Sequence, residues 1–508
     1  MENKFEIKDK YLYFSLVIFG VYFIFRLIDQ SQLLYTFPFD KTNDVAPYMT
    51  MLYFLANYGY HQIIPNWQNG FVLFQLYPPG WFYFALPIYL LTNSVLVATY
   101  SSLILMFVII FLTIFYFGMK TDMSITKRIV FFLFLFTNPI AIGNFIRLSR
   151  VTELFGWMFF IILSFLFLVY KDRKFDNKFV VIFLFAYSLL MLSHPAIMVI
   201  SPIILASLFL VKGLRERIIL IATILISFII TSFWWFFSFI NNLSSSTINN
   251  EVITKGLIKF DFQWLWTSVT ALIIPVIFFV IFYYYWKSKE KSKKELLFFL
   301  PILILNFLVL SRLIIFIPFF NNIFPDIYLI MFLFFSIYCF LNSNKVYPSI
   351  LRNIVIILLV ISPLVSISIS HFKTPYFEDR LDVHYDAIEI LSFVDNKFFI
   401  AGDIGMWIEP KKFYTSLEYA ALYDYGIIFY DLETASAVQV LGSSSESYLD
   451  SFRKTRTAFS EERCDDFLNG LNILGATNVI SYNEQCEILN KCGLKEVAKK
   501  GQVCLFKL

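Results

Sequence analysis

The first 369 residues of the chain alternate between long apolar runs and short polar segments. A hydrocarbon core about 30 Å thick needs ~20 consecutive apolar residues for each helix that crosses it. Together with the placement of the basic residues described below, the pattern predicts eleven transmembrane helices and makes residues 71–92 an interfacial or re-entrant helix instead of a span. The predicted spans are residues 11–28, 94–118, 128–142, 153–170, 178–193, 195–211, 218–240, 263–286, 295–311, 323–341 and 351–369.

The composition agrees with this pattern and excludes a water-soluble protein. Of the 508 residues, 58% are hydrophobic and 15% are charged, whereas an ordinary soluble protein is about 45–50% apolar and about 25% charged. The chain has 63 Phe and 30 Tyr, and its mean hydropathy is +0.69. So much apolar surface needs lipid around it, which excludes a cytosolic enzyme, a secreted domain and a disordered scaffold. The sequence therefore predicts an α-helical polytopic membrane protein.

The basic residues of the membrane part predict its orientation in the cell membrane. Residues 1–369 carry a net charge of +11 and residues 370–508 a net charge of −7. Because Lys and Arg in short loops stay on the cytoplasmic side, eleven spans place the N-terminus inside and the C-terminal tail outside. A twelfth span at 71–92 would move the later basic clusters outside. These clusters are Lys4/Lys8/Lys10, Lys120/Lys127/Arg128, Lys171/Arg173/Lys174/Lys178, Lys212/Arg215/Arg217, Lys287/Lys289/Lys291/Lys293/Lys294 and Lys345/Arg352.

The acidic tail, residues 370–508, predicts a small extracytoplasmic α/β domain that follows the transmembrane domain of residues 1–369. Its strands and helices alternate, which favours a mixed or parallel sheet covered on at least one face. The predicted elements are helices at 384–396, 445–459, 461–471 and 484–492 and strands at 397–403, 476–482 and 502–507.

Four of the five cysteines, Cys464, Cys486, Cys492 and Cys504, fall in this tail. Four thiols allow three pairings, and the sequence alone does not choose among them. Disulfides become plausible if the tail faces an oxidising compartment. The spacings lack the paired CxxC pattern of a zinc site. The fifth cysteine, Cys339, lies in an apolar run and is expected to be an inert core residue.

The long first outer loop, residues 29–93, carries two carboxylates close to the predicted end of the first span. They are Asp40 and Asp44. Asp44 precedes a predicted short helix at 46–57, so one interpretation is that its side chain caps that helix. The other is that a carboxylate at the membrane interface acts as a general base for a hydroxyl nucleophile or helps to hold a divalent cation.

The second outer loop, residues 143–153, has two arginines and one carboxylate at intervals of three residues. Arg147, Arg150 and Glu153 would drift slowly around one face of a helix. Two guanidinium groups suit bidentate contacts to a phosphate. The alternative is ordinary snorkelling of both arginines at the interface together with one salt bridge.

Two further ionisable residues lie near predicted span ends on the outer side. His194 sits between two apolar runs, and Arg312 follows another. Ionisable groups close to the membrane are functional candidates by default. Each therefore has two interpretations: a contact to an anionic ligand, or a side chain satisfied by a neighbouring backbone carbonyl.

Several of these features together resemble a known superfamily. An Asp shortly after the first span, Gly59 and Trp67 after a short helix, and Tyr77-Pro78-Pro79 before an aromatic segment resemble the GT-C membrane glycosyltransferases. The most similar group is the prokaryotic one labelled 6-pyruvoyl-tetrahydropterin-synthase-related. The Ser-His-Pro junction and the ending LNILGATNVISYNEQCEILN extend the resemblance over most of the chain.

The resemblance implies roles for the acidic residues. In that superfamily the first outer loop carries the catalytic Asp, here Asp44, with Asp40 as the near rival. A second acidic motif in the next outer loop often has two carboxylates, and here that loop has one, Glu153. A divalent cation such as Mg²⁺ or Mn²⁺, held by Glu153 together with Asp44, is the candidate cofactor.

The sequence thus predicts a glycosyltransferase that moves a sugar from a polyprenyl-phosphate donor to a glycan, lipid or protein acceptor on the outer face, with inversion. Asp44 would remove the acceptor proton, and Arg147, Arg150, His194 or Arg312 would stabilise the departing phosphate. A transporter or flippase is the alternative, but it calls for mid-membrane charges and repeated halves. A non-catalytic scaffold for surface assembly is the other. Membrane lipids are expected partners, and nucleic acid is not, because no solvated basic face is present.

Overall fold

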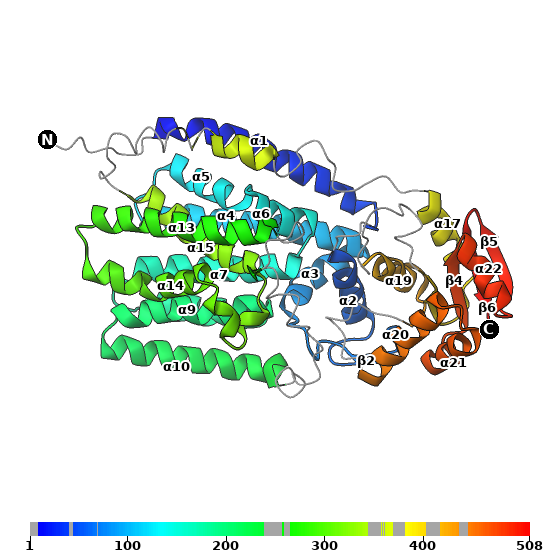
Figure 1. Ribbon diagram of the computed structural model, residues 1–508. Helices are drawn as coiled ribbons and strands as arrows, with labels where there is room; N and C mark the ends of the chain where they lie inside the picture. Colours follow the sequence, from blue (N-terminus) through cyan, green and yellow to red (C-terminus); the bar gives the residue numbers. More distant parts are fainter. Residues whose placement is uncertain are drawn as a thin grey trace.

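A computed structural model of the chain is mostly helical, with a small sheet near the C-terminus (Figure 1). Asp40 lies outside the described part of the chain, as do most of the loop at 241–262 and about half of the predicted span at 351–369. The structure describes residues 9–39, 44–68, 70–237, 257–258, 265–343, 357, 359, 361–368, 382–402, 417–435 and 446–508.

The helices of the membrane part follow the predicted spans to within a few residues. Within the described residues, five helices are long and apolar enough to cross a membrane, or six if α5 and the bent segment after it form one span. The chain is therefore a multi-pass membrane protein, and the count of eleven stays a prediction because α8, α9 and α15 are shorter. The helices are α1 (Tyr13–Gln30), α4 (Val95–Lys120), α5 (Ile125–Phe136), α6 (Pro139–Ala141), α7 (Val151–Tyr170), α8 (Asn177–Met191), α9 (Pro195–Val211), α10 (Leu214–Thr231), α13 (Leu265–Ser288), α14 (Lys293–Leu310) and α15 (Pro325–Leu341).

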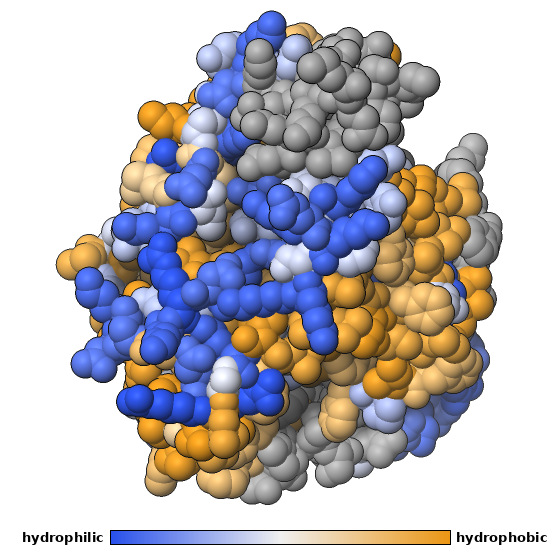
Figure 2. Space-filling view, turned by 90° about the vertical axis from the view of Figure 1, so that its left-hand side faces the viewer, coloured by the Kyte–Doolittle hydropathy of each residue, from blue (hydrophilic) through white to orange (hydrophobic). Residues whose placement is uncertain are grey.

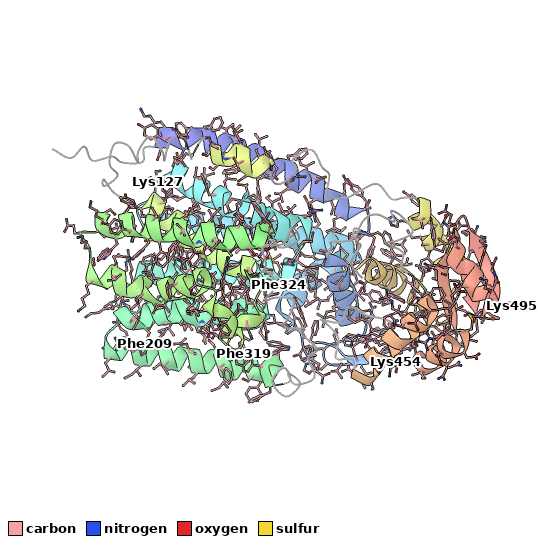
Figure 3. The ribbon with its side chains drawn as sticks, in the orientation of Figure 1. Lys127, Phe209, Phe319, Phe324, Lys454 and Lys495 are labelled. Atoms are coloured by element: carbon pink, nitrogen blue, oxygen red, sulfur yellow. A yellow bond between two sulfur atoms is a disulfide. The ribbon has the colours of Figure 1, made fainter. Side chains whose placement is uncertain are left out.

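The polar connections between these helices gather at one end of the bundle. The Lys171 ammonium, after α7, pairs with Glu295 of α14, and Lys212, after α9, donates to the carbonyl of Arg173. Figure 2 shows this end, where a band of hydrophilic side chains crosses a largely hydrophobic surface. Lys127, labelled in Figure 3, lies at the same end. The basic clusters that the structure describes thus lie on one side, as expected of cytoplasmic loops. Lys4, Lys8, Lys345 and Arg352 lie outside the described residues.

The first outer loop folds at the opposite end of the bundle, next to the C-terminal domain (Figure 1). Its helix α3 has 13 residues, too few to cross a hydrocarbon core that needs ~20. Residues 71–92 therefore do not form a regular spanning helix. The elements of the loop are η2 (Ser31–Leu34), α2 (Val45–Asn57), α3 (Gly80–Thr92) and the antiparallel pair β1 (Ile63–Ile64) and β2 (Phe71–Val72).

The C-terminal domain is built on a four-stranded mixed sheet in the order β3-β4-β6-β5. β3 pairs with β4 in parallel, and the other two pairs are antiparallel. The predicted strands and helices are present, while α19 and β5 are additional. The elements are α17 (Asp382–Leu391), β3 (Phe398–Ile400), α19 (Leu417–Tyr430), α20 (Glu446–Ser460), α21 (Cys464–Leu474), β4 (Asn478–Tyr482), α22 (Glu484–Lys491), β5 (Lys495–Lys500) and β6 (Val503–Lys507).

Helices cover both faces of this sheet. Successive residues of a strand point to opposite faces, so neighbouring residues pack against different helices. Phe398 and Ile480 belong to a buried cluster with side chains of α17 and α19. Phe399 and Val479, each one residue away, belong to a second cluster with α20, α21 and α22. Each such side chain, when fully buried, stabilises the fold by about 1.5–3 kcal/mol.

Two disulfides close the second face of the sheet. Cys464 pairs with Cys492, and Cys486 pairs with Cys504, with sequence separations of 28 and 18 residues. Of the three possible pairings, the structure selects this one. A disulfide that closes a loop of this length stabilises a fold by typically ~2–4 kcal/mol. Cys339 is a buried free cysteine, as expected.

The first outer loop is hydrogen-bonded to the C-terminal domain. The backbone N–H of Gln68 donates to the carbonyl of Thr434 at 2.9 Å, and the N–H of Thr434 donates to the carbonyl of Asn66 at 2.8 Å. On α2, the Thr50 hydroxyl donates to Asp424 of α19 at 2.8 Å. These bonds fix the loop, and with it the start of α2, against the C-terminal domain.

Candidate active site

One guanidinium, Arg150, joins three carboxylates at the end of the bundle that faces the C-terminal domain. Its Nε donates to Asp44 Oδ2 at 2.8 Å, and its Nη1 donates to Asp326 Oδ2 at 3.1 Å. Nη1 also lies 3.7 Å from Glu153 Oε2. Its Cζ lies 5.4 Å from the ring centroid of Phe324, which is labelled in Figure 3. We call Asp44, Arg150, Glu153 and Asp326 the carboxylate–arginine cluster.

Asp44 occupies the N-cap position of α2, but its side chain makes no capping bond. The carboxylate turns to Arg150 instead, so the capping interpretation is wrong. The backbone N–H of Asp44 donates to the carbonyl of Leu148 at 3.1 Å and ties the first outer loop to the second. Within the described residues Oδ1 of Asp44 has no hydrogen bond, and 29% of the side chain is exposed. One carboxylate oxygen is thus available to a ligand.

A change of helix geometry separates Arg147 from Arg150. The π-helix η3 (Ile142–Arg147) ends at Arg147, and Ser149 has a left-handed φ of 47° before α7 begins at Val151. Arg150 turns inward as the N-cap residue of α7, whereas Arg147 is exposed. The expectation that both arginines share one helix face with Glu153 was therefore wrong, because the chain turns between them.

The cluster carries an excess of negative charge. Three carboxylates face one guanidinium, and Glu153 is only 2% exposed. Burial would lower the pKa of Arg150, but the charges of Asp326, Asp44 and Glu153 outweigh burial and raise that pKa. The Trp157 indole donates to Glu153 Oε1 at 3.2 Å. A charge pair 4 Å apart near a protein surface interacts by about 4 kcal/mol, so these carboxylates hold Arg150 firmly in place.

Two tyrosines and a threonine form a buried hydroxyl network beside the cluster. The hydroxyls of Tyr77 and Thr152 lie 2.7 Å apart, and Tyr77 donates to Tyr48 at 3.1 Å. Tyr48 lies one turn after Asp44 on α2, and burial together with the charge of Asp44 raises the pKa of Tyr48 to about 12. The network connects α2, the start of α3 and α7, and so supports the position of Asp44.

His194 approaches the cluster from the junction between α8 and α9. Its Nδ1 is buried and has no hydrogen-bond partner within the described residues. In that part of the chain, no backbone carbonyl satisfies this atom. Its ring is edge-on to Tyr77 at 6.4 Å. Burial and the charge of Arg150 lower the pKa of His194 to about 3. The imidazole is therefore neutral at physiological pH.

Two glycines allow this junction to come close. A Cβ on Gly80 would lie 2.4 Å from the carbonyl oxygen of Leu192, to which the Gly80 N–H donates at 2.8 Å. A Cβ on Gly156 would lie 2.9 Å from Ser193 Oγ. Close backbone approach of this kind is available only to glycine, and it brings His194 toward the site.

Arg312 stays apart from the carboxylate–arginine cluster. Its Nη2 donates to the carbonyl of Ser268 at 2.9 Å and its Nη1 to that of Ala271 at 3.3 Å. Both carbonyls belong to α13, so the guanidinium clasps α13 to the end of α14. The structure therefore agrees with the second interpretation of Arg312, a side chain satisfied by neighbouring backbone carbonyls.

The structure shows no preformed site for the divalent cation expected at Glu153 with Asp44 among the described residues. In the part of the chain that the structure describes, no group of three or more His, Cys, Asp or Glu side chains is arranged to hold a metal. The Arg150 guanidinium contacts both carboxylates, in the position that a bridging cation would need.

The prediction from sequence missed Asp326 and its neighbour Asn144. Asp326 stands in the first turn of α15, and the Asn144 amide donates to its Oδ2. A signal was present in the sequence, since the Pro325-Asp326 pair stands at the start of an apolar run. Asp326 supplies a second carboxylate beside Glu153 from the first turn of α15, 182 residues after Asn144 in the chain.

No protein-family model and no curated protein matches the sequence. Among solved structures, the mycobacterial arabinofuranosyltransferase AftD is similar over all of this chain, with a TM-score of 0.58 and 10% identity. This chain spans 40% of the length of that protein.

Two structures of the Archaeoglobus fulgidus oligosaccharyltransferase are similar over 92% of this chain. In the complex with an inhibitory peptide and a dolichol-phosphate, the TM-score is 0.52 at 12% identity, over 69% of that chain. In the complex with Zn and sulfate, the TM-score is 0.50 at 13% identity, over 68% of that chain. The GT-C resemblance is thus confirmed at the level of fold, while no comparison points to the pterin-synthase-related group. The chain is a multi-pass membrane protein with the fold of the GT-C glycosyltransferases.

Proposed function

We propose that this protein is a glycosyltransferase that moves a sugar from a polyprenyl-phosphate donor to a hydroxyl acceptor at the outer face of the membrane. The observation that carries the proposal is that Asp44, from the first outer loop, meets Arg150, Glu153 and Asp326 at one end of the bundle. The fold shared with an arabinofuranosyltransferase and an oligosaccharyltransferase supports it.

In the proposed reaction Asp44 is the general base. Its available Oδ1 takes the proton of the acceptor hydroxyl while the acceptor oxygen attacks the anomeric carbon of the sugar. The bond between that carbon and the phosphate oxygen breaks, and the electron pair leaves with the polyprenyl phosphate. A single displacement of this kind inverts the anomeric configuration.

Arg150 is a positioning residue in this scheme. Its donors are directed to Asp44, Asp326 and Glu153, so it holds the base instead of contacting the donor. Arg147 is exposed, three residues before Arg150 in the chain, and we assign the phosphate contact to it. The neutral His194 offers an unpartnered Nδ1 as a further polar contact for the donor or the acceptor. No step is assigned to a metal ion, because Arg150 contacts both carboxylates that were expected to hold one.

The proposed orientation, with this site outside the cell, rests on two features. The basic connections lie at the opposite end of the bundle (Figure 2). The C-terminal domain at the site end holds two disulfides, which form and persist in oxidising compartments. A site outside the cytoplasm has no access to cytosolic nucleotide sugars, which favours a membrane-borne donor.

A reconstituted transfer assay tests the proposal. The purified chain is inserted in liposomes with a panel of synthetic polyprenyl-phosphate monosaccharides and a membrane glycan extract as acceptor, and the release of polyprenyl phosphate is measured. The parent protein should release it, and Asp44→Asn should lose at least ~100-fold in rate, within the range for a general base. Asp172→Asn, an exposed carboxylate at the other end of the bundle, is the matched control. Equal rates for Asp44→Asn and the control would remove the proposed base.

A further inference from the structure

The C-terminal domain contains a pocket that none of the proposed chemistry uses. It has a volume of about 510 Å³, within the ~300–1,000 Å³ typical of small-molecule sites. Helix α20 forms one wall, and Gln485 and Ile488 of α22 together with Gly402 after β3 complete the lining. Its polar lining consists of Arg453, Arg456, Thr457, Ser460 and Gln485.

Four of these residues form one stripe on α20. Arg453, Arg456, Thr457 and Ser460 stand at positions i, i+3, i+4 and i+7, which lie on the same face of a helix. Two guanidiniums and two hydroxyls are therefore presented together. Arg453 is exposed and has no ion-pair partner within the described residues, whereas exposed Lys454, the next residue, pairs with Asp450 outside the pocket.

Helix α22 supplies an unsatisfied acceptor. The side-chain oxygen of Gln485, which lines the pocket, is buried and has no hydrogen-bond partner within the described residues. Leaving a buried acceptor unpaired costs ~1–3 kcal/mol, and a ligand that donates a hydrogen bond would remove this cost. The neighbouring Cys486 is bonded to Cys504 on β6, so α22 is fixed to the sheet before any ligand binds.

We propose that this pocket binds an acidic sugar, a ligand with several hydroxyls and one carboxylate or phosphate group. The guanidiniums of Arg453 and Arg456 suit the anionic group, because their planar forks match carboxylate and phosphate oxygens. A ligand hydroxyl donates to Gln485, and the hydroxyls of Thr457 and Ser460 contact the remaining ring hydroxyls. A peptide carboxylate would satisfy the arginines but offers fewer hydroxyl donors for the rest of the lining.

The binding of an acidic sugar in this pocket does not depend on the transfer reaction. The role that we give to this binding, to hold the acceptor, rests on the proposed function. An outward-facing glycosyltransferase must hold a long acceptor, and a second contact on the C-terminal domain would increase the residence time of an acidic glycan near Asp44. Failure of binding and failure of transfer are measured separately, so each proposal can fall without the other.

Equilibrium binding to the full-length protein in detergent micelles tests the inference. The probe is trigalacturonate, with neutral maltotriose and inorganic phosphate as comparisons, and binding is followed by microscale thermophoresis. We expect saturable binding of trigalacturonate at low salt, at least tenfold weaker binding of maltotriose, and at least tenfold weaker trigalacturonate binding by Arg453→Gln. Gln485→Leu should weaken the binding of both oligosaccharides, because it removes the acceptor for a sugar hydroxyl.

The matched control is Lys454→Gln, which removes an equal charge from the residue next to Arg453 on the same helix (Figure 3). It should change the affinity for trigalacturonate less than twofold. Equal losses of affinity for trigalacturonate in Lys454→Gln and Arg453→Gln would show that only the net charge of the helix matters, and would overturn the site. Absence of saturable binding by the parent protein would overturn it as well. Inorganic phosphate that competes as well as trigalacturonate would show a bare anion site and refute the assignment to a sugar.

Discussion

The Nε of Arg150 lies 2.8 Å from Oδ2 of Asp44, although 106 residues separate them in the chain. The contact joins two outer loops whose helices start side by side, α2 after Asp44 and α7 after Arg150. Because Asp326 and Glu153 share the same guanidinium, the orientation of Asp44 depends on groups that need not touch a substrate themselves.

Asp326→Asn should therefore lower the turnover of the proposed transfer without weakening donor binding. The substitution removes one of three charges on Arg150, which frees that side chain to shift away from Asp44. A displacement of about 1 Å at a reacting group costs up to ~100-fold in rate, so we expect a loss in kcat of about 10- to 100-fold with KM for the donor nearly unchanged. A rise in KM alone would instead make Asp326 a substrate contact.

Transfer should be insensitive to chelation. The guanidinium of Arg150 lies between carboxylates that a bridging cation would need, and displacing it would leave their charges uncompensated. The rate measured in excess EDTA should equal the rate in Mg²⁺ or Mn²⁺ to within about twofold. Loss of activity in EDTA, restored by either ion, would show that Arg150 gives way to a metal during the reaction.

Gly80→Ala should reduce both the stability of the protein and the rate of transfer, because the added methyl group would clash with the backbone beside His194. The added Cβ would lie 2.4 Å from the carbonyl of Leu192, so the junction that carries His194 must move. Overpacking of this kind costs ~1–3 kcal/mol, which should appear as a lower melting temperature together with reduced transfer. Gly143→Ala, where an added Cβ meets nothing within 4 Å, is the control. Equal behaviour of the two variants would argue against the close approach.

The sequence predicted the helical layout well because hydrophobic runs alone decide where a helix lies in lipid. It predicted the sheet strands for the same kind of reason, since Phe398–Ile400 and Asn478–Tyr482 are short apolar runs. It missed Asp326, and it placed Arg147 with Arg150, because a tertiary contact and a turn at Ser149 leave no periodic signal. The parts of the site that depend on a tertiary contact or on an irregular turn were therefore the least predictable.

Labelling of introduced cysteines should settle the orientation. The described residues hold one free cysteine, Cys339, and it is buried, so a new exposed thiol gives a clean signal. Arg147→Cys should react with a membrane-impermeant maleimide on intact cells. Lys289→Cys, after α13 at the opposite end of the bundle, should react only after permeabilisation. The reverse pattern would place Asp44 on the cytoplasmic side and contradict the proposed donor.

The contact between α2 and the C-terminal domain should weaken as pH rises. Burial raises the pKa of Asp424 to about 8, although the hydrogen bond from Thr50 opposes the shift. Its second oxygen, Oδ2, is buried and has no hydrogen-bond partner in the part of the chain that the structure describes. In the unfolded chain an Asp has a pKa of about 3.9, so the folded state binds the proton more tightly. The stability from this group is complete below about pH 4 and is lost as pH rises toward 8.

Asp424→Asn should remove this dependence, because an amide keeps the bond from Thr50 and carries no charge at any pH. Thermal unfolding of the full chain in detergent, measured from pH 5 to pH 8, should show a melting temperature that falls for the parent protein and stays nearly constant for the variant. Near pH 8 the variant should have the higher melting temperature. The difference should be roughly 2–4 °C for each kcal/mol by which the substitution raises the free energy of unfolding. Asp450→Asn, an exposed carboxylate on α20, should follow the parent protein. Parallel curves for the parent and Asp424→Asn would show that Asp424 is ionised in the folded protein, and the link between α2 and α19 would then not respond to pH.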